Sequence, residues 1–275
     1  MSYYISGDSI TNNISTIQFF PKDYYDEYIK NFIDNNNLVE SLENNKTTPL
    51  IFITKVVYLD NFYNQIVKHL NNKFVLITHY GDDESGLNEN ILNHPLLIKW
   101  YGQNMKVKSN KTHGLPIGLC NELWGYTNFN ILKKYSSNPK EKLLYLNFSI
   151  SIKDRTNILN NLIKKGFTKN KKYETSNWDK YIKDLSTHKF CISPKGMGAD
   201  CHRTWECLYL GVIPIVEKST EMSFFEDLPI LFVDSYDEIS VEFLNQTYKN
   251  FQNKSFNLDK LSINYWTNKI KNHFI

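Results

Sequence analysis

The 275-residue sequence predicts an α/β protein with two Rossmann-like domains, each built on a parallel β-sheet. Two series of apolar segments alternate with stretches of helical spacing, which is the pattern of strands covered by helices on both faces. Hydrophobic residues make up 41% of the chain and aromatic residues 15%, enough to fill two cores. The polar stretch 133–142 carries a Ser-Ser-Asn-Pro turn signal, so we expect domains at 1–138 and 139–257, followed by a terminal segment at 258–275.

Each expected element follows from its local pattern. Segments that are apolar throughout predict strands in the first half at 49–54, 74–80, 96–101 and 115–119, and in the second half at 142–148, 190–193, 212–216 and 229–233. Apolar residues at helical spacing predict helices at 61–70, 155–165 and 178–185, one after the glycines near 198, a short one near 224 and a terminal amphipathic one at 258–274.

One segment combines a strand, a glycine turn and a helix, and it reads CISPKGMGADCHRTWECLYLGVIPIVE. Its first strand ends at Ser193, so the loop Pro194–Ala199 is expected at the carboxyl edge of a parallel sheet, where ligands bind. Gly196 and Gly198 allow a close backbone approach and positive φ. Asp200 suits the N-cap of the following helix, whose first N–H groups favour a phosphate.

Arginine is rare in this sequence, which has two arginines and 30 lysines. In such a background, Arg203 indicates a position where a planar, bidentate donor is needed rather than a point charge. Arg203 and Glu206 project from the same side of the expected helix. We predict that Arg203 binds a diphosphate, that Glu206 accepts hydrogen bonds from ribose hydroxyls and that Lys195 adds positive charge. Spacing also allows a plain surface ion pair beside a simple chain turn.

A dinucleotide site is a second interpretation of the same segment. Gly196 and Gly198 follow a strand, and Glu217 ends the next strand about 20 residues later, as the acidic residue of such a fingerprint does. Cys201 stands at the third glycine position, however. A strand and two helices also precede the turn, whereas the fingerprint normally opens its domain.

Composition excludes several classes of protein. The net charge of +3 and the scattered lysines give no basic surface for nucleic acid. The N-terminus lacks the pattern of a secretory signal, and no run approaches the ~20 apolar residues of a membrane span. No Asp-x-Asp follows a strand, and the histidines do not stand at zinc-ligand spacing. We expect a cytoplasmic protein, in the host cytoplasm if it is viral, with four free thiols: Cys120, Cys191, Cys201 and Cys207.

Segment 190–216 resembles the signature of exostosin-like glycosyltransferases and their viral and bacterial relatives. A Pro-Gly turn, an Asp, an Arg-x-Trp-Glu and a Gly-x-Ile-Pro follow one another in the same order. The stretch NFSISIKDR resembles the first strand–loop–helix of that family's donor domain, which places Arg155, and Ser149 in the same loop, at the nucleotide. More weakly, three stretches resemble the N-terminal domain of small members: 74–83, 98–105 and 115–125.

The resemblance implies a GT-B fold, in which two Rossmann-like domains face a cleft and the last helix crosses back to the first domain. It implies a nucleotide-sugar donor, expected to be a UDP-sugar, and a hydroxyl acceptor on a glycan or glycoconjugate. No cofactor or metal is expected, because Arg203, Lys195, Arg155 and loop N–H groups can stabilise the departing diphosphate. Two further interpretations stay open: an NAD-dependent oxidoreductase and a nucleotide-sugar-binding module without turnover. At 275 residues, we expect a compact version of this family without the membrane anchor and stem of secretory-pathway members.

An inverting transfer also needs a general base, expected from the first domain. The stretch FVLITHYGDDES supplies His79, Asp82, Asp83 and Glu84 at a strand end. Asp8, which also follows a glycine, is another candidate. We choose Asp82, since the resemblance places an Asp after a strand end that contains a histidine, and we rank His79 and Asp8 behind it. The plain alternative is a solvated Gly-Asp-Asp turn.

Overall fold

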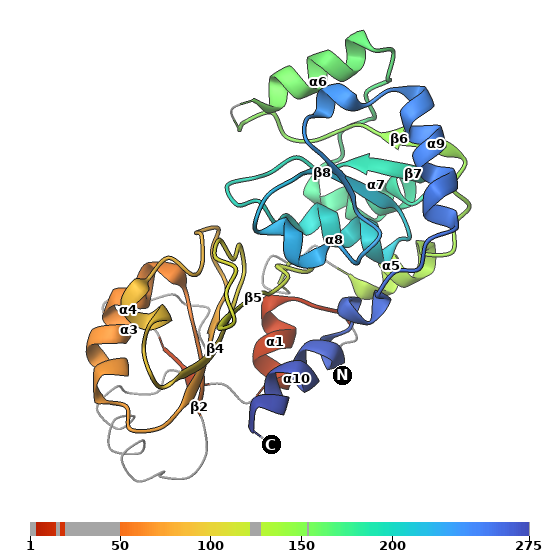
Figure 1. The fold of residues 1–275 in the computed structure, drawn as a ribbon. Coiled ribbons are helices and arrows are strands. Elements are labelled where there is room, and N and C mark those ends of the chain that lie inside the picture. The colour runs from red at the N-terminus through yellow and green to blue at the C-terminus, as the bar shows by residue number, and fades with distance from the viewer. Residues whose placement is uncertain (1–3, 15–16, 20–49, 122–127, 153, 275) are drawn as a thin grey trace. The chain divides into compact units, whose positions relative to one another are not determined.

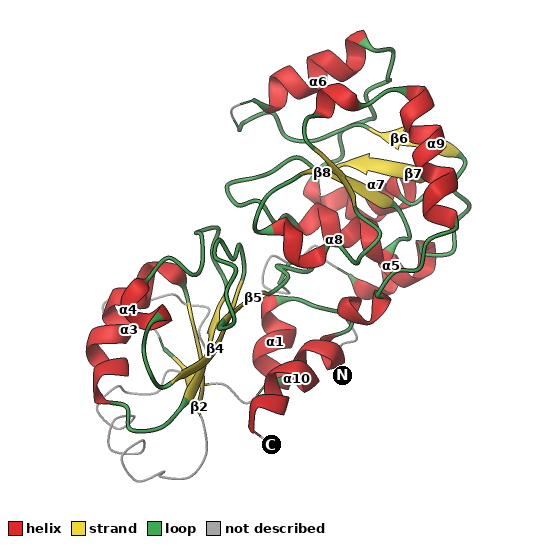
Figure 2. Cartoon of the chain, in the orientation of Figure 1, coloured by secondary structure: helices red, strands yellow, loops and turns green. Residues whose placement is uncertain are grey.

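The computed structural model describes residues 4–14, 17–19, 50–121, 128–152 and 154–274 (Figure 1). The chain forms two compact units, Met1–Ile117 with Ser262–Ile275, and Gly118–Leu261. Each unit is α/β with one parallel sheet, as the sequence predicts (Figure 2). The division falls before α5 (Phe129–Tyr135), which therefore belongs to the second unit and not, as expected from the polar stretch 133–142, to the first.

The first unit holds a five-stranded sheet of order β1-β2-β3-β4-β5, all parallel. Its strands are β1 (Ile17–Gln18), β2 (Leu50–Thr54), β3 (Phe74–Thr78), β4 (Leu97–Gly102) and β5 (Thr112–Gly114). Its helices are α1 (Gly7–Asn13), η1 (Val56–Tyr58), α3 (Leu59–Gln65), η2 (Val67–His69), α4 (Glu89–Leu92), α10 (Ile263–Lys271) and η8 (Asn272–Phe274). Every residue of β2 and β3 is buried, which explains their apolar sequences.

The prediction of a strand at 115–119 is wrong. The last strand of the sheet, β5, ends at Gly114, and residues 115–119 form no strand. Pro116 has no N–H to donate to a strand ladder, and Gly118 adopts a φ of 69°. The apolar side chains here are still buried, so the pattern reported burial rather than strand structure.

The terminal helix α10 completes the core of the first unit. Trp266 and Ile270 are fully buried, and the Trp266 ring lies edge-on to His113 of β5, with centroids 5.7 Å apart. The Tyr101 hydroxyl of β4 hydrogen-bonds His273 Nε2 at 2.8 Å. The first unit is thus assembled from two chain segments, one that precedes the second unit in the sequence and one that follows it.

The second unit holds a four-stranded parallel sheet of order β6-β7-β8-β9. Its strands are β6 (Lys142–Tyr145), β7 (His188–Ile192), β8 (Ile213–Glu217) and β9 (Leu231–Val233). Its helices, besides α5, are α6 (Arg155–Lys164), η4 (Thr175–Asn177), α7 (Trp178–Leu185), α8 (His202–Tyr209), η5 (Met222–Phe225), η6 (Tyr236–Glu238), α9 (Val241–Gln252) and η7 (Leu258–Leu261). The twelve-residue helix α9 was not predicted.

The two faces of this sheet are covered by different helices. Leu144 and Phe190 share a hydrophobic cluster with Leu159 of α6 and Leu244 of α9. Alternate residues of a strand point to opposite faces, so Tyr145 points the other way, and its ring meets Tyr181 of α7. Side chains from both faces can therefore reach the carboxyl edge of the sheet.

Candidate functional site

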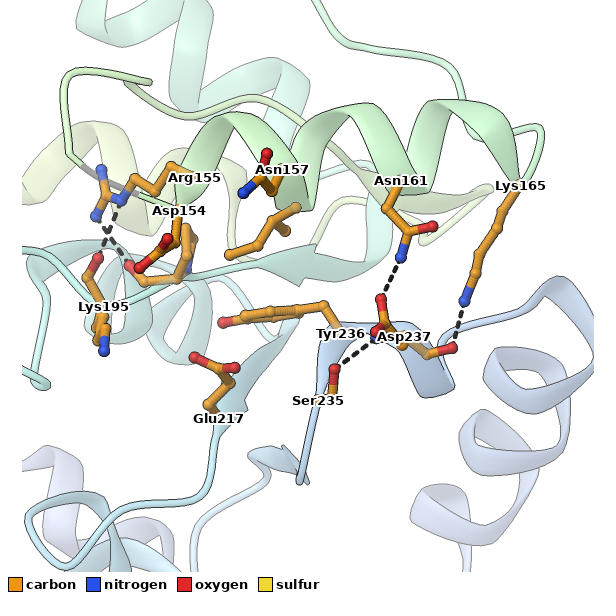
Figure 3. Close-up of a pocket in the computed structure, with 12 residues that line it drawn as sticks. Asp154, Arg155, Asn157, Asn161, Lys165, Lys195, Glu217, Ser235, Tyr236 and Asp237 are labelled. Atoms are coloured by element: carbon orange, nitrogen blue, oxygen red, sulfur yellow. Dashed lines mark hydrogen bonds between the residues drawn. The ribbon is translucent and has the colours of Figure 1, made fainter.

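A cavity of about 700 Å³ lies at the carboxyl edge of the second unit's sheet. It runs along α6 and is closed by the ends of β7 and β8 and by the turn after β9 (Figure 3). Ten of its twelve lining residues have polar or charged side chains, with cations and carboxylates in equal number: Asp154, Arg155, Asn157, Ile158, Asn161, Lys165, Pro194, Lys195, Glu217, Ser235, Tyr236 and Asp237. Parallel sheets bind ligands at this edge, and the polar lining suits a hydrophilic one.

Arg155 joins the loops that follow β6 and β7. Its Nη1 donates to the Ser149 carbonyl at 3.1 Å, Nη2 to the Pro194 carbonyl at 2.9 Å and Nε to the Lys195 carbonyl at 3.0 Å. A Cβ on Gly196 would lie 3.7 Å from Nη2, an ordinary van der Waals distance, so the packing of Arg155 does not itself require a glycine at this position. The structure thus brings together Arg155, Pro194, Lys195 and the Ser149 backbone, which were predicted as one site. The Ser149 side chain itself is exposed.

Arg203 approaches the same edge from the other face. Its guanidinium lies over the Tyr181 ring, 5.7 Å from the centroid, and its Nη1 donates to the Asn147 carbonyl after β6. Its Nε is buried and finds no acceptor among the described residues. Burial alone would lower the pKa of Arg203, but Tyr181, Cys191 and Glu206 raise it, so the side chain is charged. Arg203 is half-buried and does not line the cavity itself, but a cation with an unused donor at this edge is a suitable partner for an anion.

Glu206 is not a surface residue. It is 6% exposed, and its carboxylate accepts from the Tyr181 hydroxyl at 2.6 Å and from Trp178 Nε1 at 3.4 Å. No ion pair joins it to Arg203 within 4.0 Å, so the plain surface pair is not formed either. Both oxygens of Glu206 already accept hydrogen bonds, and Glu206 does not line the cavity.

The glycine turn folds differently from the expectation. Among the described glycines, those with positive φ are Gly86, Gly118, Gly166 and Gly211, so Gly196 and Gly198 do not use this freedom. Instead Gly196 N–H donates to the Gly198 carbonyl at 2.9 Å and closes a tight loop.

The N-cap predicted at Asp200 is wrong. Cys201 occupies that position, without a side-chain cap, and Asp200 Oδ1 instead accepts from the indole of Trp205 at 2.7 Å. Burial of the indole N–H demands an acceptor, and this need outweighs capping. Ser193 is also buried, and its hydroxyl hydrogen-bonds Thr204 at 2.9 Å. Asp200 and Ser193 hold the loop in place.

His202 is a neighbour of the site that the sequence did not reveal. Its Nδ1 hydrogen-bonds the Gly118 carbonyl at 2.8 Å, a contact across 84 residues that no local pattern signals. Burial alone would lower the pKa of His202, but hydrogen bonds to Cys120 and Gly118, and the charge of Glu206, raise it to about 9. His202 therefore adds positive charge at the start of α8 near neutral pH.

The candidate bases lie in the first unit. His79 is buried, and its Nε2 hydrogen-bonds the Pro116 carbonyl at 3.0 Å. Asp82 is exposed, and its backbone carbonyl accepts from Asn104 Nδ2 at 3.1 Å. Asp8 is half-buried in the first turn of α1. His79 and Asp82 follow the carboxyl end of β3, and Tyr80 of the same loop hydrogen-bonds Gly7 and Thr11 of α1, the helix that carries Asp8.

Tyr80 connects α1 with the loop after β3. Its hydroxyl donates to the Gly7 carbonyl at 2.9 Å and hydrogen-bonds Thr11. Burial, and to a lesser extent the charge of Asp8, raise the pKa of Tyr80 to about 12. Tyr80 and Asn104 both have left-handed backbones, with φ of 67° and 50°. Such conformations are unusual for residues other than glycine, and they concentrate at functional sites.

In the described residues, no three His, Cys, Asp or Glu side chains gather as the ligands of a metal would. No helix in that part of the chain is long and apolar enough to cross a membrane. The sequence matches no model of a known protein family, and a search of curated proteins gives no match either.

Proposed function

We propose that the protein is a glycosyltransferase that moves a sugar from a UDP-sugar to a hydroxyl group of a glycan or glycoconjugate. One observation carries the proposal: both arginines of the chain lie at the carboxyl edge of the second sheet, around one loop. Burial lowers the pKa of Arg155, and the positive charge of nearby Arg203 lowers this pKa further. Two like charges within range of each other favour a bound anion, and a diphosphate is such an anion.

In the proposed reaction, the acceptor hydroxyl attacks the anomeric carbon while the bond to the diphosphate breaks. UDP leaves with the bonding electron pair, and the acceptor proton passes to a base, for which Asp82 is the first candidate. Lys195 is exposed at the cavity, and Arg203 Nε has an unused donor, so both can stabilise the negative charge that develops on UDP. This arrangement supplies charge stabilisation without requiring a metal.

An NAD-dependent oxidoreductase is the second candidate, favoured by the position of Glu217. This residue ends β8, the strand paired with β7, and lines the cavity. The same place is occupied by the acidic residue of a dinucleotide fingerprint. However, α8 begins at His202, four residues beyond Gly198, whereas the fingerprint's helix opens within its glycines. We therefore rank this candidate second.

A thermal-shift measurement with UDP and with NAD separates the two candidates. A ligand that binds only the native state stabilises it by about 2.7 kcal/mol at a hundredfold excess over its Kd. Stabilisation by UDP is the expected result, and stabilisation by NAD alone would refute the transferase. Slow release of UDP from UDP-sugars, followed with a panel of such donors, separates an enzyme from a binding module.

A further inference from the structure

Three carboxylates line the cavity, and they differ in what they contact. Asp237 accepts a hydrogen bond from Asn161 Nδ2. Asp154 is exposed at the N-cap position of α6. Glu217 is half-buried, and among the described residues no hydrogen-bond donor or cation pairs with its carboxylate. Of the three, Glu217 is the enclosed acid whose lone pairs are still available.

The fold holds Glu217 rigidly. It is the last residue of β8, lies opposite Val233 of β9 and follows four buried residues. Figure 3 shows its carboxylate directed toward Tyr236, whose buried hydroxyl donates to the Ser193 carbonyl at 3.3 Å. A side chain fixed on a strand positions a ligand better than one on a mobile loop.

Cations lie close to this acid in the same cavity. Lys195 is exposed, and no anionic partner is found for its ammonium in the described part of the chain. Arg155 uses three of its five donors on carbonyls, which leaves two for a ligand. The cavity thus offers donors for an anion beside an acceptor-only carboxylate.

This combination defines the ligand group that fits. A carboxylate can only accept, so its partner must carry donors, and two neighbouring hydroxyls match its two oxygens. A nucleoside diphosphate has a ribose diol next to its phosphates. We infer that Glu217 accepts hydrogen bonds from the 2′ and 3′ hydroxyls of the bound ribose, an assignment that rests on the proposed function for the nucleotide. Glu206, which was expected in this role, has both oxygens engaged by Tyr181 and Trp178.

Binding of UDP and of its 2′,3′-dideoxy analogue tests the inference by calorimetry. Charge-assisted hydrogen bonds contribute enough that Glu217→Gln should weaken UDP binding about 10-fold or more. The dideoxy analogue lacks both hydroxyls, so its Kd should change less than about twofold. Glu226→Gln is the matched control, because Glu226 is exposed and lies outside the cavity. Glu217→Ala should repeat the result of Glu217→Gln.

Each outcome has a defined meaning. Equal UDP affinity in the wild-type protein and in both Glu217 variants would overturn the inference and leave the proposed function standing. A weakened affinity for UDP-glucose with unchanged UDP binding would assign Glu217 to the transferred sugar, which also overturns it. Absence of UDP binding by the wild-type protein would overturn the proposed function and this inference together.

Discussion

Replacement of Arg155 by lysine tests whether a planar fork is needed at the edge of the second sheet. The wild-type guanidinium reaches three carbonyls, those of Ser149, Pro194 and Lys195, through three different nitrogens. A lysine keeps the charge but has one nitrogen at the end of an unbranched chain. It can reach one of these carbonyls well, so two hydrogen bonds between the loops should be lost.

The expected cost follows from the exposure of these bonds. A hydrogen bond to a charged group contributes about 1.5–3 kcal/mol when it is buried. Arg155 is half-buried, and two of its three hydrogen bonds are exposed to solvent. We therefore expect each lost hydrogen bond to reduce the stability of the closed loops by about 0.5–1 kcal/mol. Arg155→Lys should therefore make opening of the two loops easier by about 1–2 kcal/mol.

Amide hydrogen exchange measures this opening directly. The change corresponds to exchange that is about 5–30-fold faster in segments 146–152 and 194–199. Lys164→Arg on the same helix is the matched control, because Lys164 is exposed and lines no part of the cavity. Exchange rates in Arg155→Lys within about twofold of the wild-type rates would refute the reasoning, since the fork would then be dispensable.

Three further substitutions test the remaining assignments. Arg203→Lys keeps the charge but loses the planar group over Tyr181, and kcat/KM for sugar transfer should fall about tenfold or more; wild-type kinetics would show that a point charge suffices. Glu206→Ala leaves the Tyr181 hydroxyl and the Trp178 indole without their acceptor. The free energy of unfolding in urea should therefore fall by about 1–3 kcal/mol. An unchanged free energy of unfolding would mean that water replaces the carboxylate. Asp82→Asn keeps the shape but removes the basicity, so transfer should stop while UDP affinity stays the same; near-normal turnover would exclude Asp82 as the base.

The strands were predictable because burial on both faces leaves a direct mark on the sequence. Residues 50–54 and 74–78 are apolar apart from a terminal threonine, and both form buried strands. The same rule failed at 115–119, where side chains are buried without strand pairing. Helix α9 was missed although Leu244, Tyr248 and Phe251 stand at helical spacing, because polar residues separate them.

The site was predictable in its location but not in its contacts. The scarcity of arginine and the glycine turn pointed to the edge of the sheet at which the cavity lies. Arg155 and Arg203 donate hydrogen bonds to backbone carbonyls. Every residue has a carbonyl, so these acceptors could not be predicted from residue types. Glu206 was assigned to a ligand, but it accepts from Tyr181 of α7; Asp200 was assigned to a cap, but it accepts from Trp205, five residues further along in α8. The pairing of Glu206 with α7 arises from tertiary packing, which spacing along one helix does not contain.

The route of the chain through its two units sets an order for folding during synthesis. The second unit is one continuous stretch, so it can fold as soon as Leu261 has left the ribosome. The first unit begins earlier but waits for Trp266 and Ile270, which the ribosome makes after the other core residues that the structure describes in this unit. Until then, the nascent sheet of the first unit exposes the apolar surface that α10 will cover. A stop codon just before Ser262 would remove α10 and η8, and it should therefore leave the second unit intact and the first unit aggregation-prone.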